Sequence, residues 1–313
     1  MSVLVVGNAV FDIAYRVPHL PRPGETLLAS ARTIDVGGKG LNQAIAARRA
    51  GAEVRLLAPV GRDAAAERIR AALAAEGIDP GLLVAGEAPT DESVIWVAED
   101  GENAIVSTAL AARALTPADV EAVGTLGPTD TLLMQGNIPI ATTAHCLDLA
   151  RRRGARLVVN TAPLVPGAGL LVPMADVLVV NAGEAAGLSG KREPAAATEV
   201  LVARGAVSVV VTLGAAGVHL LANGERHHVP TPRVKPVDTT GAGDVFTGVL
   251  VAALDAGADL PGATAWAARA AALKVTRRGT VAGFPTGAEL AALRKAALPD
   301  GGDLPYQGGL SGP

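Results

Sequence analysis

Short apolar runs alternate with helical segments along most of this chain, and this alternation constrains the fold more than any other feature. The runs are continuously apolar, which is typical of strands buried on both faces of a parallel sheet. Predicted strands cover Ser2 to Val6, Val54 to Pro59, Thr131 to Met134, Leu157 to Asn160, Val177 to Asn181 and Val207 to Leu213. Helical patterns cover Leu41 to Ala50, Ala64 to Glu76, Ala141 to Arg153, Ala195 to Gly205 and Ala263 to Thr276. We therefore predict a three-layer α/β/α fold with a mostly parallel central sheet.

One interval does not follow this alternation. Asp91 to Ser107 resembles an antiparallel strand pair that turns at Glu99-Asp100-Gly101-Glu102. Together with a turn-rich stretch after the first strand, it predicts a small β lid formed by residues near 12–35 and 91–108. We expect this lid to belong to a single domain over residues 1–298. A tail rich in glycine, proline and aspartate, residues 299–313, is expected to be flexible.

Composition narrows the possible classes of function. With 313 residues the chain can form one large α/β domain, and because aromatic residues make up only 2% of it, the core must consist of Ala, Val and Leu. A net charge of −3 argues against general binding to nucleic acid or to membrane surfaces. The single cysteine, Cys146, excludes an internal disulfide and predicts a buried, unreactive thiol in a reducing cytoplasm. No apolar run is long enough to span a membrane, so we predict neither a signal peptide nor a transmembrane helix.

The segment from Val237 to Phe246 is the strongest local candidate for a functional site. Gly241, Ala242 and Gly243 are too small to cover their own backbone, so a ligand can reach their N–H groups. Apolar residues with helical spacing follow and end at Gly257, which places these N–H groups at the start of a buried helix. Helix starts attract anions, so the segment predicts a site for a phosphate or for a developing phosphoryl charge.

Asp244 lies in the first turn of this predicted helix. Its carboxylate would repel a bound anion, so binding alone is a poor explanation for it. One explanation is a general base that removes a proton from a hydroxyl group attacking the phosphate. The other is an N-terminal cap, since aspartate is common at that position. The segment alone leaves both explanations open.

Gly37-Gly38-Lys39-Gly40 forms a second glycine-rich segment, directly before the helix that begins near Leu41. It is not a P-loop, because that motif needs four residues between its first glycine and the Gly-Lys pair. No G-x-G-x-x-G follows the first strand, which argues against a dinucleotide-binding Rossmann domain. Lys39 and Asn42 are one helical turn apart and suit hydrogen bonding to a polyhydroxylated ligand. A glycine turn with a solvated lysine is the alternative for this segment taken alone.

Together these segments resemble the signatures of the ribokinase-like (PfkB) carbohydrate kinases. Gly37 to Ala44 and Asp238 to Asp244 look like the two signatures of that family, in the right order. Asn181-Ala182-Gly183-Glu184 resembles its N-x-x-E motif, and Thr212-Leu213-Gly214-Ala215-Ala216-Gly217 resembles its nucleotide-binding T-L-G-x-x-G. Pro23 to Thr26 and Val275 to Gly279 are also similar to segments of this family. The resemblance spans the chain up to about Leu298, and it is specific because the motifs stand in register.

The resemblance implies an enzyme that transfers the γ-phosphoryl group of ATP to a hydroxyl group of ribose or of a related pentose or ketohexose. Asp244 is then the general base, and Gly241, Ala242 and Gly243 form an anion hole for the transferred group. Such a transition state needs positioning and charge stabilisation more than covalent chemistry.

The resemblance also implies the contacts to the nucleotide and to metal ions. Mg²⁺ would keep most of its water and bridge the phosphates, with Asn181 and Glu184 contacting it largely through that water. The residues that would lie along the nucleotide are Thr212, Gly214, Gly217 and Gly243. A monovalent cation, K⁺, would bind Asp238, Thr240 and the backbone carbonyls of Lys274, Arg277 and Gly279, and would order the anion-hole loop.

The sugar contacts that the resemblance implies are Asp12, Gly38, Lys39, Asn42, Asn137 and Asp244. Two positions depart from the family pattern. Val10 replaces an asparagine two residues before Asp12, and Asn137 replaces an acid after the strand that ends at Gln135. Pockets that hydrogen-bond hydroxyl groups discriminate strongly when a partner is missing. A ketohexose or a modified sugar is therefore a candidate beside ribose.

The lid would close over the sugar and exclude water, which limits wasteful hydrolysis of ATP. Its exposed edge predicts pairing with a second copy, and hence a homodimer. Two other functions remain as alternatives: a nucleoside kinase of the same fold, and a sugar- or nucleotide-binding regulator without catalysis. The intact segment Gly241-Ala242-Gly243-Asp244 argues against the regulator.

Overall fold

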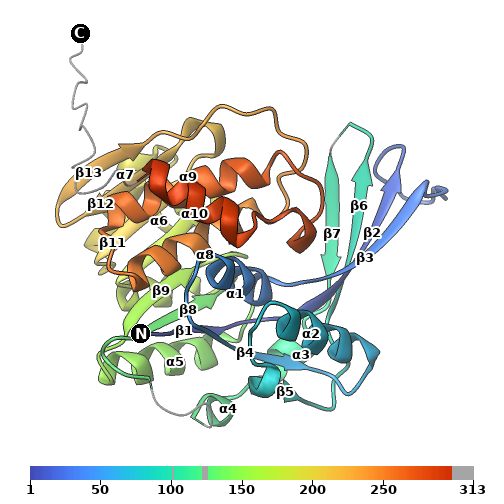
Figure 1. The fold of residues 1–313 in the computed structure, drawn as a ribbon, viewed down its shortest axis with the longest axis horizontal. Helices are drawn as coiled ribbons and strands as arrows, with labels where there is room; N and C mark the ends of the chain where they lie inside the picture. Colours follow the sequence, from blue (N-terminus) through green and yellow to red (C-terminus); the bar gives the residue numbers. More distant parts are fainter. Residues whose placement is uncertain (101, 122–125, 298–313) are drawn as a thin grey trace.

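The main sheet runs through the centre of the molecule in the strand order β13-β12-β11-β10-β9-β8-β1-β4-β5 (Figure 1). This computed structural model describes residues 1–100, 102–121 and 126–297. The strands of the main sheet are β1 (Val3–Val6), β4 (Val54–Val60), β5 (Leu83–Ala85), β8 (Thr131–Gln135), β9 (Arg156–Asn160), β10 (Val177–Asn181), β11 (Ser208–Thr212), β12 (Val218–Ala222) and β13 (Glu225–Val229). All pairings from β5 to β11 are parallel, which confirms the predicted mostly parallel sheet.

The hairpin of β12 and β13 extends the sheet with antiparallel pairs that the sequence interpretation missed. Its two strands are joined by Asn223 and Gly224, and both have positive φ, 52° and 78°. Asn-Gly at such a turn is the strongest short-range signal for a hairpin. The signal was therefore present in the sequence, although the alternation of strands and helices did not point to it.

Helices cover both faces of the main sheet, as predicted. One layer holds α1 (Lys39–Arg49), α2 (Ala64–Ala75), α8 (Ala242–Asp255), α9 (Leu260–Lys274) and α10 (Gly287–Ala297). The other holds α3 (Leu110–Ala114), α4 (Pro117–Glu121), α5 (Ile140–Arg152), α6 (Ala182–Ser189) and α7 (Pro194–Ala203). Short 3₁₀ turns are η1 (Pro80–Leu82), η2 (Ala168–Met174), η3 (Gly214–Ala216) and η4 (Val281–Gly283).

The central strands are continuously apolar because they face two cores. In β1, Val3 and Val5 belong to the core beneath α1 and α8, whereas Leu4 and Val6 belong to the core beneath α5 and α6. Neighbouring side chains of a strand point to opposite faces, so a sheet covered twice needs apolar residues at every position.

A second, smaller sheet projects from one end of the main sheet and forms the lid (Figure 1). Its strands, in the order β3-β2-β6-β7, are β2 (Val10–Val17), β3 (Ala31–Gly37), β6 (Glu92–Ala98) and β7 (Asn103–Ser107). The antiparallel pair predicted between residues 91 and 107 is β6 with β7. Gly101 in its turn and the predicted flexible tail, 299–313, lie outside the described residues.

The structure bears on two expectations, the buried thiol of Cys146 and the lack of a transmembrane helix. The Cys146 thiol is buried and unpaired, and burial raises its pKa to about 12, in agreement with an unreactive thiol. Among the described residues, none of the helices has both the length and the apolar character needed to cross a bilayer.

Candidate active site

A cleft with a volume of about 830 Å³ lies between the lid and the ends of the central strands. It brings together predicted residues that are far apart in sequence. Its lining includes the six predicted sugar contacts and two residues of the segment from Val237 to Phe246: Asp12, Gly38, Lys39, Asn42, Asn137, Asp244, Thr240 and Gly241. Because β1, β4 and β8 are parallel, their carboxyl ends share one edge of the sheet, and open α/β sheets bind ligands at that edge.

Helix α8 opens toward this cleft at its N-terminus. Gly241 is its N-terminal cap, with φ 77°, and no side chain caps the first turn. A Cβ at Gly241 would come within 2.8 Å of a ring carbon of Phe284, so only glycine fits this left-handed position. No side chain therefore covers the N–H groups at the start of α8, as the predicted anion hole of Gly241, Ala242 and Gly243 requires, although Ala242 N donates to Thr239 O at 3.2 Å.

The alternative in which Asp244 caps its own helix is wrong. The cap is Gly241, and Asp244 lies three residues further on with its carboxylate in contact with another helix. Asn42 donates through Nδ2 to Oδ2 at 3.0 Å, Gln43 donates through Nε2 to Oδ1 at 3.0 Å, and Lys39 Nζ lies 3.7 Å from Oδ1. The carboxylate is only 5% exposed. All three partners come from α1.

The spacing of these partners follows from the geometry of α1. Residues three and four apart lie on one face of a helix, so Lys39, Asn42 and Gln43 all point at α8. Glycine allows the two helices to approach closely, because a Cβ at Gly248 would lie 2.6 Å from both Ala46 Cβ and Gln43 O. The sequence interpretation identified Lys39 and Asn42 but missed Gln43, although Gln43 stands within the first signature.

Gln43 belongs to a row of buried amides that fixes the direction of its hydrogen bonds. Asn160 donates through Nδ2 to the backbone carbonyl of Val179 at 2.9 Å, and because a carbonyl can only accept, Asn160 must present Oδ1 to Gln43. Gln43 therefore turns Nε2 toward both Asn160 Oδ1, at 3.0 Å, and Asp244. Gln135 donates to Gln43 Oε1 at 2.9 Å. The fold thus forces Gln43 to offer a donor to Asp244.

The sugar side of the cleft contains oxygens without partners. Asn42 Oδ1 and Asn137 Oδ1 are buried and accept no hydrogen bond from the described residues. Buried polar atoms normally have partners, so these two acceptors fit a ligand that brings hydroxyl groups. Val10 lines the same cleft with an apolar side chain.

Asp12 lies on the cleft face of the lid. Burial raises the pKa of its carboxyl to about 6, a hydrogen bond from Ser93 opposes the shift, and the charges of Asp35 and Asp244 add to it. Asp35 is the residue directly opposite Asp12 on β3. Asp12 and Asp244 both line the cleft, where sugar hydroxyls could donate hydrogen bonds to them.

The residues predicted to bind the nucleotide lie next to one another but do not line the cleft cavity. Asn181 and Thr212 are paired at the ends of β10 and β11. Asn181 Oδ1 accepts from Glu184 N at 2.8 Å, and Glu184 Oε2 accepts from Asn181 N at 2.9 Å, so the two form a capping box for α6. Gly214 and Gly217 flank the turn that follows β11 and have positive φ. Their role in nucleotide binding remains a prediction.

The set predicted to bind a monovalent cation is assembled, but in an unexpected way. Asp238 accepts hydrogen bonds from Thr240 N and Gly279 N, both at 2.9 Å. Lys274 was predicted to contribute its backbone carbonyl, yet that carbonyl accepts from Arg277 N at 2.9 Å. The side chain of Lys274 enters the site instead, with Nζ 2.9 Å from Asp238 O and 3.3 Å from Arg277 O. A K⁺ ion and this ammonium group cannot both contact these two oxygens, so the residues present do not fit the predicted ion.

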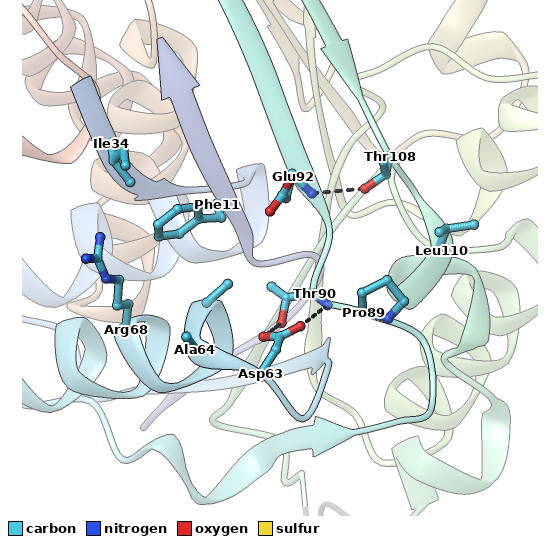
Figure 2. Close-up of a pocket in the computed structure, with 11 residues that line it drawn as sticks. Phe11, Ile34, Asp63, Ala64, Arg68, Pro89, Thr90, Glu92, Thr108 and Leu110 are labelled. Carbon is cyan, nitrogen blue, oxygen red and sulfur yellow. Dashed lines mark hydrogen bonds between the residues drawn. The ribbon is translucent and has the colours of Figure 1, made fainter. Parts of the chain in front are cut away.

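A second cavity, of about 530 Å³, lies on the other face of the lid (Figure 2). Phe11 and Glu92 line it, and because they alternate with Asp12 and Ser93, the two cavities are separated by the lid sheet. Asp63 in this cavity accepts from Thr90 N at 2.8 Å and from Thr90 Oγ1 at 2.7 Å (Figure 2). It contains none of the predicted site residues, so the cleft is the candidate active site.

The chain is similar to known proteins over most of its length. The profile of a family described as "pfkB family carbohydrate kinase" matches residues 1–287. The chain is 32% identical to ribokinase from Haemophilus influenzae over 292 residues, which cover 91% of this chain and 95% of that protein. It is 30% identical to deoxyribokinase from Salmonella typhi, over 91% of this chain and 96% of that protein. The structure of Arabidopsis thaliana ribokinase complexed with ribose and ATP superposes with a TM-score of 0.84 at 26% identity, covering 94% of this chain and 98% of that one.

Proposed function

The chain belongs to the pfkB family of carbohydrate kinases and is an ATP-dependent sugar kinase, for which we propose a substrate and a general base. The proposed substrate is ribose or a related pentose or ketohexose. The proposed general base is Asp244. The observation that supports the proposal best is the position of the Asp244 carboxylate. It lines the cleft beside the open N-terminus of α8, and its orientation is fixed by Asn42 and Gln43.

The chemistry requires one proton transfer and one phosphoryl transfer. As the oxygen of a sugar hydroxyl attacks the γ-phosphorus, Asp244 takes the proton of that hydroxyl, the bond to the β-phosphate oxygen breaks, and ADP leaves. The start of α8 has no side-chain cap, and this supports a role of Gly241 and Gly243 in stabilising the charge on the transferred group; Ala242 N already donates to Thr239 O at 3.2 Å. Lys39, 3.7 Å from Asp244 and about a third exposed, adds positive charge at the same place.

Mg²⁺ fits the donors on the nucleotide side. The capping box uses one oxygen of Asn181 and one of Glu184, which leaves the second carboxylate oxygen of Glu184 for a hydrated ion. Among the described residues no cluster of three or more acidic, histidine or cysteine side chains could hold a metal on its own, which suits an ion carried mainly by phosphates and water. When bound, Mg²⁺ would neutralise phosphate charge.

Thr212, Gly214 and Gly217 would lie along the nucleotide. A monovalent cation is not part of this proposal, because the Lys274 ammonium occupies its place.

The choice of sugar depends on one end of the cleft. Asp12, Gly38, Lys39, Asn42 and Asn137 would contact its hydroxyl groups, and the unpartnered oxygens of both asparagines support this. Val10 stands where the family pattern has an asparagine, so that end of the cleft has one polar contact fewer. Arg113 also lines the cleft and makes no ion pair with any described residue, so sugars with an acidic substituent belong among the candidates.

A substrate panel tests the proposal. It contains ribose, deoxyribose, fructose, other ketoses, an acidic sugar, adenosine and cytidine, with ADP formation as the readout. We expect a pentose or ketohexose to give the highest kcat/KM. Asp244→Asn should lower kcat by about 10²–10⁴-fold or more while nucleotide binding, measured by calorimetry, is retained. Unchanged turnover in this variant would reject the base, and preference for a nucleoside would replace the proposed substrate class.

We propose a homodimer formed through the lid, and a cytoplasmic location. The edge strand β7 supports the dimer, since Ile105 and Val106 are 50% and 61% exposed. Light scattering after size exclusion measures the mass, and a purely monomeric protein would contradict the dimer.

The buried free thiol of Cys146 is in keeping with a reducing compartment such as the cytoplasm. Fluorescence of a tagged chain in its own cell would test this location.

A further inference from the structure

Lys274 is a buried lysine whose amino group lies among backbone oxygens. It is the last residue of α9, and its side chain is 0% exposed. Nζ donates to Asp238 O at 2.9 Å and to Arg277 O at 3.3 Å, and it lies 3.9 Å from Asp238 Oδ2. Fully buried lysines are rare unless they are paired. The position therefore calls for an explanation beyond packing.

The surroundings of the amino group are oxygen atoms that suit a cation. Asp238 supplies the negative charge, and two carbonyls supply lone pairs, which is the kind of oxygen cage that binds a desolvated monovalent ion. Both carboxylate oxygens of Asp238 are already bonded, Oδ1 to Thr240 N and Oδ2 to Gly279 N. One carboxylate and one ammonium balance each other, so the site has no net charge left to attract a further cation.

This site joins the two segments that position the start of α8. Val237 N and Asp238 N donate to Val275 O at 2.7 and 3.1 Å, and Gly279 N donates to Asp238. The ammonium of Lys274 adds a bond to each segment, through Asp238 O and Arg277 O. Gly241, the cap of α8, follows Asp238 by three residues, so the contacts of Asp238 set where the anion-binding loop lies.

We propose that the ammonium group of Lys274 is a built-in cation that orders the anion-hole loop, so that this kinase needs no monovalent metal ion. Lys274 is a positioning residue: it acts through the loop from Asp238 to Gly241 and touches no reacting atom. The proposal rests on the proposed function of that loop as the γ-phosphoryl site. It concerns which group supplies the positive charge beside the loop from Asp238 to Gly241, and the proposed kinase activity does not depend on the answer.

The unmodified protein gives the first test. Its kcat and its melting temperature are measured with KCl and with tetramethylammonium chloride at equal ionic strength, since the bulky cation cannot enter a cage of carbonyls. We expect kcat to agree within about twofold and the melting temperature to stay the same. Activation of the unmodified protein by K⁺ of tenfold or more would overturn the proposal, and this arm needs no variant to fold.

Two variants at the same position give the second test. Lys274→Ala removes the charge and leaves space, whereas Lys274→Met removes the charge and fills the space. In tetramethylammonium chloride, kcat of both variants should be about 10- to 100-fold lower than that of the unmodified protein, because a small displacement of the loop from Asp238 to Gly241 misplaces the groups that it positions. K⁺ or NH₄⁺ should restore at least about tenfold in Lys274→Ala but not in Lys274→Met. Lys295→Ala, an exposed lysine on α10, is the charge control and should not respond to either ion.

Melting temperature separates this proposal from the kinase assignment. K⁺ that binds the folded Lys274→Ala variant should raise its melting temperature by roughly a few degrees, whether or not the protein turns over any sugar. If no sugar is phosphorylated but K⁺ stabilises only this variant, the proposed function fails and the built-in cation stands. If K⁺ neither rescues nor stabilises Lys274→Ala, a merely structural lysine explains the contacts and the proposal is overturned.

Discussion

Asp238 and Asp244 stand six residues apart, before and inside the first turn of α8, and they are held in different ways. Asp244 accepts hydrogen bonds from side-chain amides of Asn42 and Gln43, some two hundred residues earlier in the chain. Asp238 accepts from the backbone N–H groups of Thr240 and Gly279 and faces the ammonium of Lys274. Asp244 is therefore bound by side-chain amides, of which Asn42 can turn over, whereas Asp238 is bound by backbone N–H groups, which cannot.

The difference fits the roles proposed for the two residues, with Asp244 as the general base and Asp238 as a support for the loop. Asn42 Oδ1 has no partner among the described residues, so its amide can turn over when the charge on Asp244 changes. A backbone N–H has no such freedom. Although burial alone would raise the pKa of Asp238, the hydrogen bonds from Thr240 and Gly279 and the charge of Lys274 together hold it below its usual range. These contacts thus favour the ionised form of Asp238.

The largest expected effect is the stability cost of Asp238→Asn. It leaves the Lys274 ammonium without its counter-charge and places an NH₂ group against one of two backbone donors. We expect a loss of about 2–4 kcal/mol in the free energy of unfolding, near the lower end because the Asp238 side chain is 26% exposed. Urea denaturation measures it.

Asp244→Asn is the matched variant for this comparison. Its Oδ1 can still accept from Gln43, and Asn42 can turn over and accept from the new NH₂ group, so the free energy of unfolding should change by less than about 1 kcal/mol. Equal destabilisation by the two substitutions would break the distinction between the two aspartates.

The second prediction concerns the amide that holds Asp244. Gln43→Met keeps the size of the side chain but removes the donor to Oδ1, and we expect kcat to fall about 10- to 100-fold with little change in the KM for ATP. Gln135→Met is the control, because Gln135 is equally buried and touches Gln43 but not Asp244.

A double-mutant cycle separates positioning from packing. In the Asp244→Asn background, Gln43→Met should have little further effect on kcat, since the group it positions is gone. Additive losses in the double variant, or an equal fall of kcat in Gln135→Met, would mean that Gln43 serves the core and not the carboxylate.

The smallest effect is a pH dependence on the sugar side. Burial raises the pKa of Asp12 to about 6, so below that pH its carboxyl is protonated and accepts sugar hydroxyls poorly. The KM for the sugar should rise as the pH falls from 7 to 5, by up to about tenfold per unit below the pKa. Asp12→Asn should remove this dependence. A KM that is constant from pH 7 to 5 in the unmodified protein would contradict the assignment.

Stability gives an independent check on the same group. Because the pKa of Asp12 is higher in the folded protein than its ordinary value of 3.8, its contribution to stability is present below about pH 4 and is lost as the pH rises through about 6. Asp12→Asn should therefore be more stable than the unmodified protein at pH 7 and lose this advantage near pH 4. Thermal unfolding at both pH values measures the difference.

Much of the fold could be predicted from the chain because its signals are local. The continuously apolar runs at Val3–Val6 and Val177–Asn181 predicted a sheet covered on both faces, and helical spacing after Gly241 predicted α8. A glycine at the start of α8 follows from a local cause, its positive φ, whereas its contact with the Phe284 ring comes from the tertiary structure.

The sequence alone determined which residue types the site contains: an acid after two glycines, a lysine and an asparagine one turn apart, and two signatures in register. Tertiary structure decided which groups meet. In the sequence, Gln43 is one more polar residue of α1; in the structure, Asn160 is held by the backbone carbonyl of Val179 and fixes the direction of the Gln43 amide. Lys274 was expected to contribute its carbonyl, whereas in the structure its side chain contacts Asp238. The reason is physical: hydrogen-bond polarity and the location of a buried charge depend on partners from distant segments, and residue identity does not encode which partner packing will bring near.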